Sequence, residues 1–317
     1  MNAPIALMPD RTTFIGGSDA AAILGVSRWK SPFQLYQEKI GAFVEESNPA
    51  RDKVLNRGKR WEPVVVEMLI DELILRGHSV ELIGRNCRYQ DPEFPFLACE
   101  IDLEFLIDGE EVNGEIKTVH PFAAKDWGEE GTDEIPVYYV AQCMHGMMVK
   151  PRKRAIVAAL IGADDLRIHE ITRDDELIST IRAKEIEFWA RVQTLNPPEP
   201  TEPEDVKWLY AKDAGTVAEA DDSLALVCQD LKDKKARAKE LEKTIESLET
   251  ALKIRMGDAA VLLYRNEPIA TWKTQSARRI NIEALVEAHP DIAESFRATT
   301  ESRVLRLKSK SKNRRKR

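Results

Sequence analysis

The strongest constraint on the fold is an alternation of charged and apolar residues on either side of a short polar segment, 108–111. Asp102 precedes this segment, and Glu115, Ile116 and Lys117 follow it. Successive side chains of a β-strand point to opposite faces of the sheet, so Glu115 and Lys117 share one face and Ile116 points to the other. The segment and its flanks are therefore predicted to form a β-hairpin, with Asp102 on one strand and the charged pair on the next.

The charged face of this hairpin has the composition of a metal-dependent phosphodiesterase site. Two carboxylates and an ammonium group are costly to bury without a ligand. Carboxylate oxygens suit hard cations such as Mg²⁺, and a neighbouring Lys can hold or deprotonate a water molecule. A solvated, charged hairpin without catalytic function is the alternative, so the interpretation depends on other segments.

Three further segments carry polar residues that suit such a site. Glu62 lies near the start of a predicted amphipathic helix, where the helix dipole also favours a carboxylate. Gln142 and His145 are three residues apart on another predicted helix and share a face, as a polar surface pair would also do. The Gly-Gly-Ser-Asp sequence at 16–19 can bind an anion through backbone N–H groups or simply begin a helix.

The four cysteines form no metal or redox motif, because none belongs to a Cys-x-x-Cys pair. Reduced thiols in a cytoplasmic protein are expected. The N-terminus has no basic segment before an apolar one, and no apolar run approaches the roughly 18 residues of a membrane span. A cytoplasmic protein with no membrane association is therefore predicted. The cysteines are Cys87, Cys99, Cys143 and Cys228.

Charge is distributed unevenly along the chain. The net charge is −7, yet residues 303–317 contain nine Lys or Arg and no Asp or Glu. This basic tail indicates either a contact with a polyanion or a solvated, disordered end.

The order of the predicted elements indicates an α/β fold with a mixed central sheet flanked by helices. A Pro-rich linker at 196–203 separates a domain of residues 1–195 from an accessory region, 204–317. That region is expected to contain a heptad-patterned helix (about 219–256), a β-hairpin (about 260–275) and the basic tail. Helices of the first domain are predicted between Ser18 and Gly25 and over 33–40, 57–76, 137–149 and 174–192, and strands over 80–83, 87–89, 97–107, 112–117, 155–161 and 166–171.

Five blocks, taken in order, resemble the YqaJ-type viral recombinase exonucleases, relatives of phage lambda exonuclease in the PD-(D/E)xK nuclease superfamily. The resemblance covers roughly residues 11–195 and implies the restriction-endonuclease-like core of that superfamily. The sequence departs from the family at Ile101-Asp102-Leu103, where Pro-Asp-Gly is frequent, and at Glu100, where a small hydroxyl residue is frequent. The blocks are Ile15-Gly-Gly-Ser-Asp-Ala-Ala21, Gly58-Lys-Arg-Trp-Glu62, Asp102, Glu115-Ile-Lys117 and Tyr139-x-x-Gln142-x-x-His145-x-Met147.

The resemblance implies a 5′→3′ exonuclease that acts at double-stranded DNA ends and leaves 3′ single strands for a partner annealing protein. Asp102, Glu115 and the Ile116 carbonyl would hold Mg²⁺, or Mn²⁺ instead. Lys117 would orient or activate the attacking water. Glu62 would support the metal, and Gln142 would lie beside the catalytic centre.

The resemblance implies that Arg11 binds the 5′-phosphate and that Ser18 contacts a DNA phosphate. Asp19 and Arg28 are also predicted to bind DNA or its phosphates. Relatives can form toroidal trimers, so the resemblance implies a homo-oligomer. It also implies a protein of phage or prophage origin that acts in a bacterial host cell. Two alternatives remain: a structure- or site-specific endonuclease on the same core, and a non-catalytic DNA-binding recombination scaffold.

Overall fold

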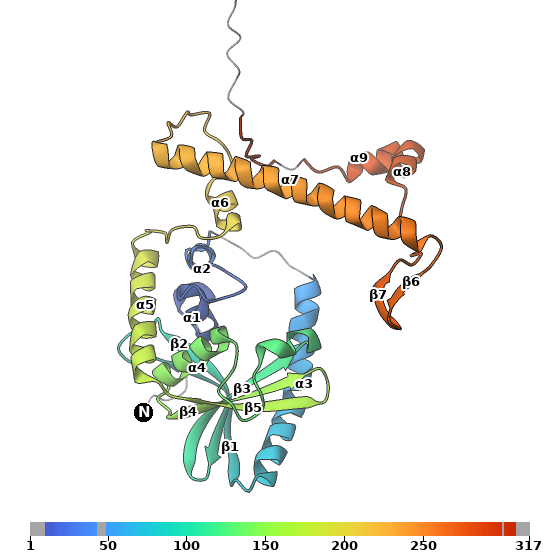
Figure 1. The fold of residues 1–317 in the computed structure, drawn as a ribbon. Helices are drawn as coiled ribbons and strands as arrows, with labels where there is room; N and C mark the ends of the chain where they lie inside the picture. Colours follow the sequence, from blue (N-terminus) through green and yellow to red (C-terminus); the bar gives the residue numbers. More distant parts are fainter. Residues whose placement is uncertain (1–9, 43–48, 300, 309–317) are drawn as a thin grey trace, which may run out of the picture. The chain divides into compact units, whose positions relative to one another are not determined.

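Five strands of the first part of the chain pair in one mixed sheet, in the order in which they occur in the sequence (Figure 1). All neighbours are antiparallel except β3 and β4, which are parallel. The connection between these two passes through the 3-10 helix η2 (Pro121–Asp126) and the helix α4 (Val137–Val149), since a parallel pair needs a long crossover. The strands are β1 (Val80–Gln90), β2 (Ala98–Ile107), β3 (Glu110–Val119), β4 (Arg154–Ile161) and β5 (Asp165–Thr172).

The structure is a computed structural model that describes residues 10–42, 49–299 and 301–308. Contacts along the chain divide it into two units, Met1–Leu209 and Tyr210–Arg317. Among the described residues, no helix is both long and apolar enough to cross a membrane.

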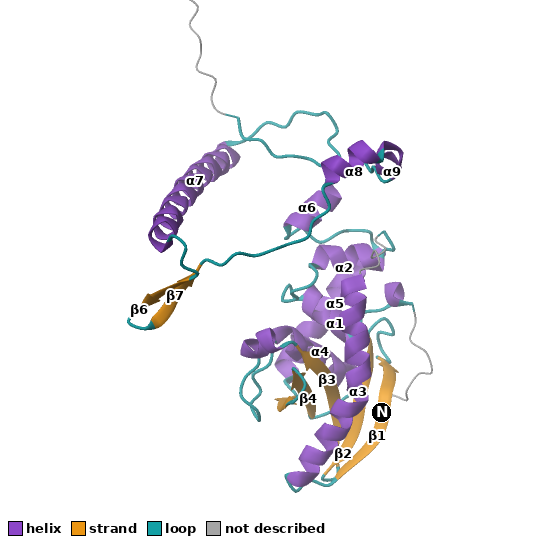
Figure 2. Cartoon of the chain, turned by 90° about the vertical axis from the view of Figure 1, so that its right-hand side faces the viewer, coloured by secondary structure: helices purple, strands orange, loops and turns teal. Residues whose placement is uncertain are grey.

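Helices cover both faces of the five-stranded sheet (Figure 2). On one face, Val65 and Leu69 of α3 (Pro49–Leu75) lie in a buried cluster with Leu103 and Phe105 of β2. The other face is covered by a larger cluster to which α1 (Gly17–Ile23), α2 (Pro32–Lys39), α4 and α5 (Asp175–Gln193) all contribute. The predicted α/β fold with a mixed sheet flanked by helices is confirmed.

Three predicted boundaries are wrong. The helix predicted over 57–76 begins at Pro49, because its first two turns are exposed and have no apolar face for the pattern to detect. The two strands predicted over 80–83 and 87–89 are one strand, β1, with a register shift between Leu82 and Gly84. Gly16, rather than Ser18 or Asp19, caps α1, and the Asp19 carboxylate accepts the Gly16 N–H at 3.0 Å.

The polar segment of the predicted hairpin is a two-residue turn. Asp108 and Gly109 have φ angles of 51° and 83°. Asn, Asp and Gly tolerate this left-handed region best, and such a turn matches the twist of the flanking strands. The turn sets the register Ile107–Glu110, which continues to the pair Leu103–Gly114.

The second unit consists of a long helix, a small hairpin and two short helices. The heptad-patterned segment forms α7 (Asp222–Met256), and β6 (Val261–Tyr264) pairs with β7 (Glu267–Thr271). The sequence did not predict α8 (Ile282–Ala288) or α9 (Pro290–Ser295). Residues 303–308 of the basic tail have no helix or strand, and 309–317 lie outside the described residues. The remaining helix, α6 (Pro203–Leu209), belongs to the first unit, where Asp205 accepts a 2.7 Å hydrogen bond from the Ser31 hydroxyl.

Candidate active site

The predicted hairpin brings Asp102 and Glu115 together where β2 and β3 stop pairing. The backbone ladder between these strands ends at Leu103–Gly114. One residue further, the Asp102 carboxylate accepts the Ile116 N–H at 3.0 Å. The Ile116 side chain packs with the α3 cluster, so its neighbours Glu115 and Lys117 point to the α4 side, as the alternation predicted.

Helix α4 completes a hydrogen-bonded group around Glu115. The Oε1 atom of Glu115 accepts hydrogen bonds from Lys117 Nζ and from Gln142 Nε2, each at 2.5 Å. Lys117 Nζ also donates to Gln142 Oε1 at 3.3 Å. Three side chains from two elements therefore hold one another in place, and the structure brings together the residues that the sequence singled out.

The carboxylates and the ammonium shift one another's pKa. Burial, together with the nearby Glu115 carboxylate, raises the pKa of Asp102 to about 7. Burial by itself would lower the pKa of Lys117, but the Glu115 and Asp102 carboxylates outweigh it and raise that pKa above its ordinary value. The raised pKa of Lys117 favours its ammonium form, which donates hydrogen bonds to Glu115 and Gln142.

Glu62 and Glu100 lie at the edge of this group. Burial raises the pKa of Glu62, and the Asp102 and Glu100 carboxylates raise it further. Glu100 forms a 2.6 Å ion pair with Arg88 and lines the same cavity as Asp102. The residue that departs from the family pattern thus adds negative charge beside the site.

A cavity of about 330 Å³ lies against this group. Asp102, Glu115 and Gln142 line one part of it, and Arg11 and Ser18 line another. These five residues from the predicted catalytic and phosphate-binding sets, which are up to 131 positions apart in the sequence, therefore share one cavity.

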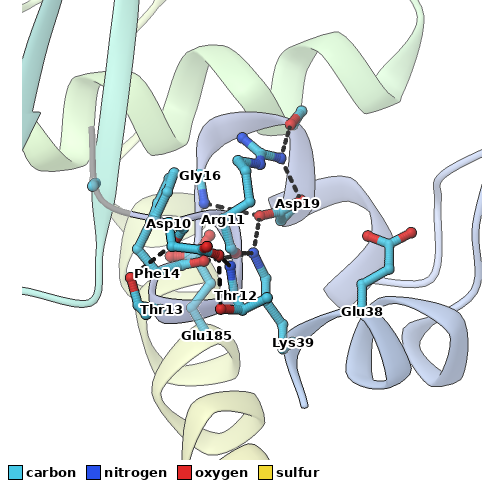
Figure 3. Close-up of polar contacts among 12 residues, drawn as sticks. Asp10, Arg11, Thr12, Thr13, Phe14, Gly16, Asp19, Glu38, Lys39 and Glu185 are labelled. Carbon is cyan, nitrogen blue, oxygen red and sulfur yellow. Dashed lines mark hydrogen bonds and ion pairs between the residues drawn. The ribbon is translucent and has the colours of Figure 1, made fainter. Parts of the chain in front are cut away.

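Arg11 is held by an ion-pair network that the sequence did not predict (Figure 3). Its Nη2 lies 3.1 Å from both the Ser18 hydroxyl and Asp19 Oδ1. The other Asp19 oxygen pairs at 2.8 Å with Lys39 Nζ, which also donates to the Arg11 and Phe14 carbonyls. Asp19 is buried and paired with Arg11 and Lys39, so its contacts hold the Arg11 side chain in place, and its part in DNA binding stays a prediction.

Arg28 lies away from the catalytic cavity, on the exposed loop between α1 and α2. Its guanidinium lies over the Trp29 ring at 5.3 Å and donates to the Tyr138 hydroxyl at 3.3 Å.

His145 does not face the cavity with Gln142. It is fully buried, with Nδ1 2.8 Å from Glu185 Oε1 and Nε2 3.0 Å from the Ala98 carbonyl. Both neighbours are acceptors, so only the imidazolium form can donate to both. Burial would lower the pKa of His145, but the Glu185 carboxylate and the hydrogen bonds outweigh it and raise that pKa.

Raising the pH is expected to destabilise the first unit through His145. Its folded pKa is above the unfolded value of about 6.5. The stabilisation is therefore complete below that value and is lost as the pH rises through the folded pKa. Urea denaturation between pH 6 and 9 should show this loss. Glu185→Gln should flatten the pH dependence, since an amide can donate to the neutral ring, and an equal slope in both proteins would contradict the assignment.

The sequence also missed Asn113, which lies two residues before Glu115 and lines the same cavity. It is buried, and neither its side-chain oxygen nor its nitrogen has a hydrogen-bond partner among the described residues. Buried amides are normally paired, so this one is available to a molecule in the cavity. Strand alternation places Asn113 on the same face as Glu115 and Lys117, and this spacing in the sequence could have identified it.

Comparison with known proteins decides the family. Residues 8–153 match the YqaJ-like viral recombinase domain. The uncharacterized protein YqaJ of Bacillus subtilis (strain 168) is 30% identical over 324 residues, which cover 95% of this chain and 93% of that protein. The chain belongs to the YqaJ family. The resemblance seen in the sequence is confirmed, and the similarity to YqaJ extends well beyond the first unit.

Two solved structures that show some similarity to this YqaJ-family chain are described as exonucleases. One is the alkaline exonuclease LHK-Exo from Laribacter hongkongensis, with a TM-score of 0.45 and 19% identity, covering 63% of this chain and 95% of that one. The other is a phage-related exonuclease from Haemophilus somnus 129PT, with a TM-score of 0.41 and 15% identity, covering 57% and 94%. The family assignment rests on the sequence matches.

Proposed function

We propose that this protein is a Mg²⁺-dependent nuclease that degrades one strand of double-stranded DNA from its ends, 5′→3′, and leaves 3′ single strands for homologous recombination. The main support is that Asp102 and Glu115 line one cavity and that Lys117 donates a hydrogen bond to Glu115. Membership in a family of viral recombinase domains supports the role in recombination.

The donor set of the cavity fits a hard divalent cation. Among the described residues, no group of three or more His, Cys, Asp or Glu could hold a metal ion. Asp102, Glu115 and the Ile116 carbonyl supply two carboxylates and one neutral oxygen, and Mg²⁺ is typically bound by one or two carboxylates with several waters. A cation between the carboxylates would relieve the repulsion that raises the pKa of Asp102. The unpaired amide of Asn113 is a polar partner for a water in the same cavity.

Each residue has a distinct part in the proposed hydrolysis. When bound, the cation supplies charge neutralisation at the phosphodiester and lowers the pKa of the attacking water. Lys117, which is protonated, donates a hydrogen bond that orients this water or stabilises the charge developing on the phosphate. Gln142 fixes the positions of Lys117 and Glu115, and Glu62 adds negative charge near Asp102.

Arg11 suits the 5′-phosphate of the end being degraded. Its side chain is 60% exposed and lines the catalytic cavity, while Ser18 and Asp19 hold its Nη2. A planar guanidinium can bind two oxygens of a terminal phosphate at once. A phosphate held there would place the first phosphodiester bonds of that strand close to Asp102 and Glu115.

Digestion of end-labelled DNA tests this proposal. The substrates are linear duplexes with 5′-phosphate or 5′-hydroxyl ends and a covalently closed circle, each with Mg²⁺, Mn²⁺ or EDTA. We expect metal-dependent degradation of the linear DNA from the 5′ end, faster with a 5′-phosphate, and an intact circle. Asp102→Asn, which keeps the shape of the side chain, should remove the activity; full activity in this variant would refute the site.

The same digestion separates the alternative functions. Cutting of the closed circle would identify an endonuclease, and binding without any hydrolysis would identify a recombination scaffold. A homo-oligomer, such as a trimer around the DNA, and a single-strand annealing protein as partner remain part of the proposal.

A further inference from the structure

A row of aromatic rings leads from the proposed catalytic lysine to the protein surface. Lys117 Nζ lies 4.7 Å from the centre of the Tyr139 ring. Tyr139 contacts Tyr138 at 4.6 Å, and Tyr138 contacts Trp29 at 4.7 Å, both edge-on. Trp29 is 57% exposed, so the row ends in a large aromatic ring that faces solvent.

A cation accompanies the exposed end of this row. The Arg28 guanidinium lies 5.3 Å from the Trp29 ring and 5.9 Å from the Tyr138 ring, and it donates to the Tyr138 hydroxyl. Arg28 is itself exposed. Aromatic faces beside a cation are the combination by which proteins bind single-stranded nucleic acid, because bases stack on the rings and the cation contacts the backbone.

We infer that Trp29, Tyr138 and Arg28 form a stacking site for an unpaired nucleobase of the DNA strand that enters the catalytic cavity. This inference rests on the proposed nuclease function, and it names a substrate element that the metal site does not explain. Every base has a flat π-face, so the site would accept any base. The contacts of Tyr139 with Tyr138 and with Lys117 connect this site to the proposed catalytic residues.

The arrangement favours DNA over a purely apolar partner. The Trp29 and Tyr138 rings meet edge-on, and Trp29 stays 57% exposed beside the Arg28 guanidinium. Arg28 brings a positive charge that a polyanion would require. A protein partner that used Trp29 as an anchor would have no need of the connection to Lys117.

Binding without cleavage tests the inference. Short oligothymidylates are titrated into the full-length protein in EDTA, with Trp fluorescence and anisotropy of a labelled oligonucleotide as readouts. We expect Trp29→Ala to weaken binding by about 5- to 150-fold, the range for loss of one stacked base, and Trp29→Phe to retain part of the affinity. An oligonucleotide with abasic positions should bind wild type and Trp29→Ala alike.

Two comparisons make the outcome decisive. Trp272→Ala, a matched change at a 48% exposed Trp of the second unit, should leave oligonucleotide binding unchanged. Equal affinity of wild type and Trp29→Ala for the normal oligonucleotide, or equal losses in both Trp variants, would overturn the stacking site. Because the assay needs no hydrolysis, failure of the nuclease proposal would appear separately, as intact linear DNA in the presence of Mg²⁺.

Discussion

Lys117→Met is expected to reduce DNA hydrolysis by about 100- to 1,000-fold, the usual effect of removing one preorganised donor from a reaction centre. The change removes the ammonium that bonds both Glu115 and Gln142. It replaces the ammonium beside the Tyr139 ring with an apolar side chain of similar length, so the loss should appear in kcat rather than in folding. Single-turnover cleavage of a 5′-phosphorylated duplex in saturating Mg²⁺ measures it.

A matched control separates catalysis from general charge effects. Lys184→Met removes an ammonium from the exposed face of α5 and should leave the rate within about twofold, as surface changes usually do. Lys117→Arg keeps the charge but not the shape, and partial activity would show that charge matters most. A Lys117→Met enzyme that cleaves like wild type would remove this residue from the mechanism.

Asp19→Ala is expected to lower the free energy of unfolding by about 3–5 kcal/mol, as when one partner of a buried ion pair is removed. The side chains of Asp19 and Lys39 are only 1% and 2% exposed. Without the carboxylate, the Lys39 ammonium is buried with carbonyls alone, and Arg11 loses the group that orients it. Urea denaturation followed by Trp fluorescence measures the change.

The second half of the pair provides the control. Asp19→Leu combined with Lys39→Met removes both charges and should recover much of the stability, because two apolar side chains can replace a buried pair. A double-mutant cycle then gives the coupling between Asp19 and Lys39. If Asp19→Ala cost less than about 1 kcal/mol, the network around Arg11 would not be a structural element of the site.

The sequence predicted those parts of the site in which the signal is local. Alternation around Asp108-Gly109 placed Glu115 and Lys117 on one face, and helical spacing placed Gln142 on α4. The family resemblance then related Asp102 to Glu62. The predictions for Glu115, Lys117 and Gln142 needed only strand and helix periodicity together with one turn.

What the sequence missed depends on contacts between distant elements. Lys39 occupies the last turn of α2, where a cation also suits the helix dipole, so nothing in the sequence distinguished it from a surface residue. Helical spacing predicted only that His145 shares a face with Gln142, and Glu185, forty residues later, provides its partner. Neither α8 nor α9 was predicted, since each is too short for a periodic pattern to stand out.

The place of β3 in the sheet has a further consequence. It is the third of five strands, and it pairs with β2 as far as Gly114 and with β4 from Asn113 to Val119. Local opening of a protein begins at frayed ends and exposed edges, whereas a central strand exchanges its amide hydrogens only through the largest openings. Glu115 and Lys117 therefore belong to an interior strand that should open late through its pairing with β4, whereas the site also depends on Asp102 of β2 and Gln142 of α4 staying in place.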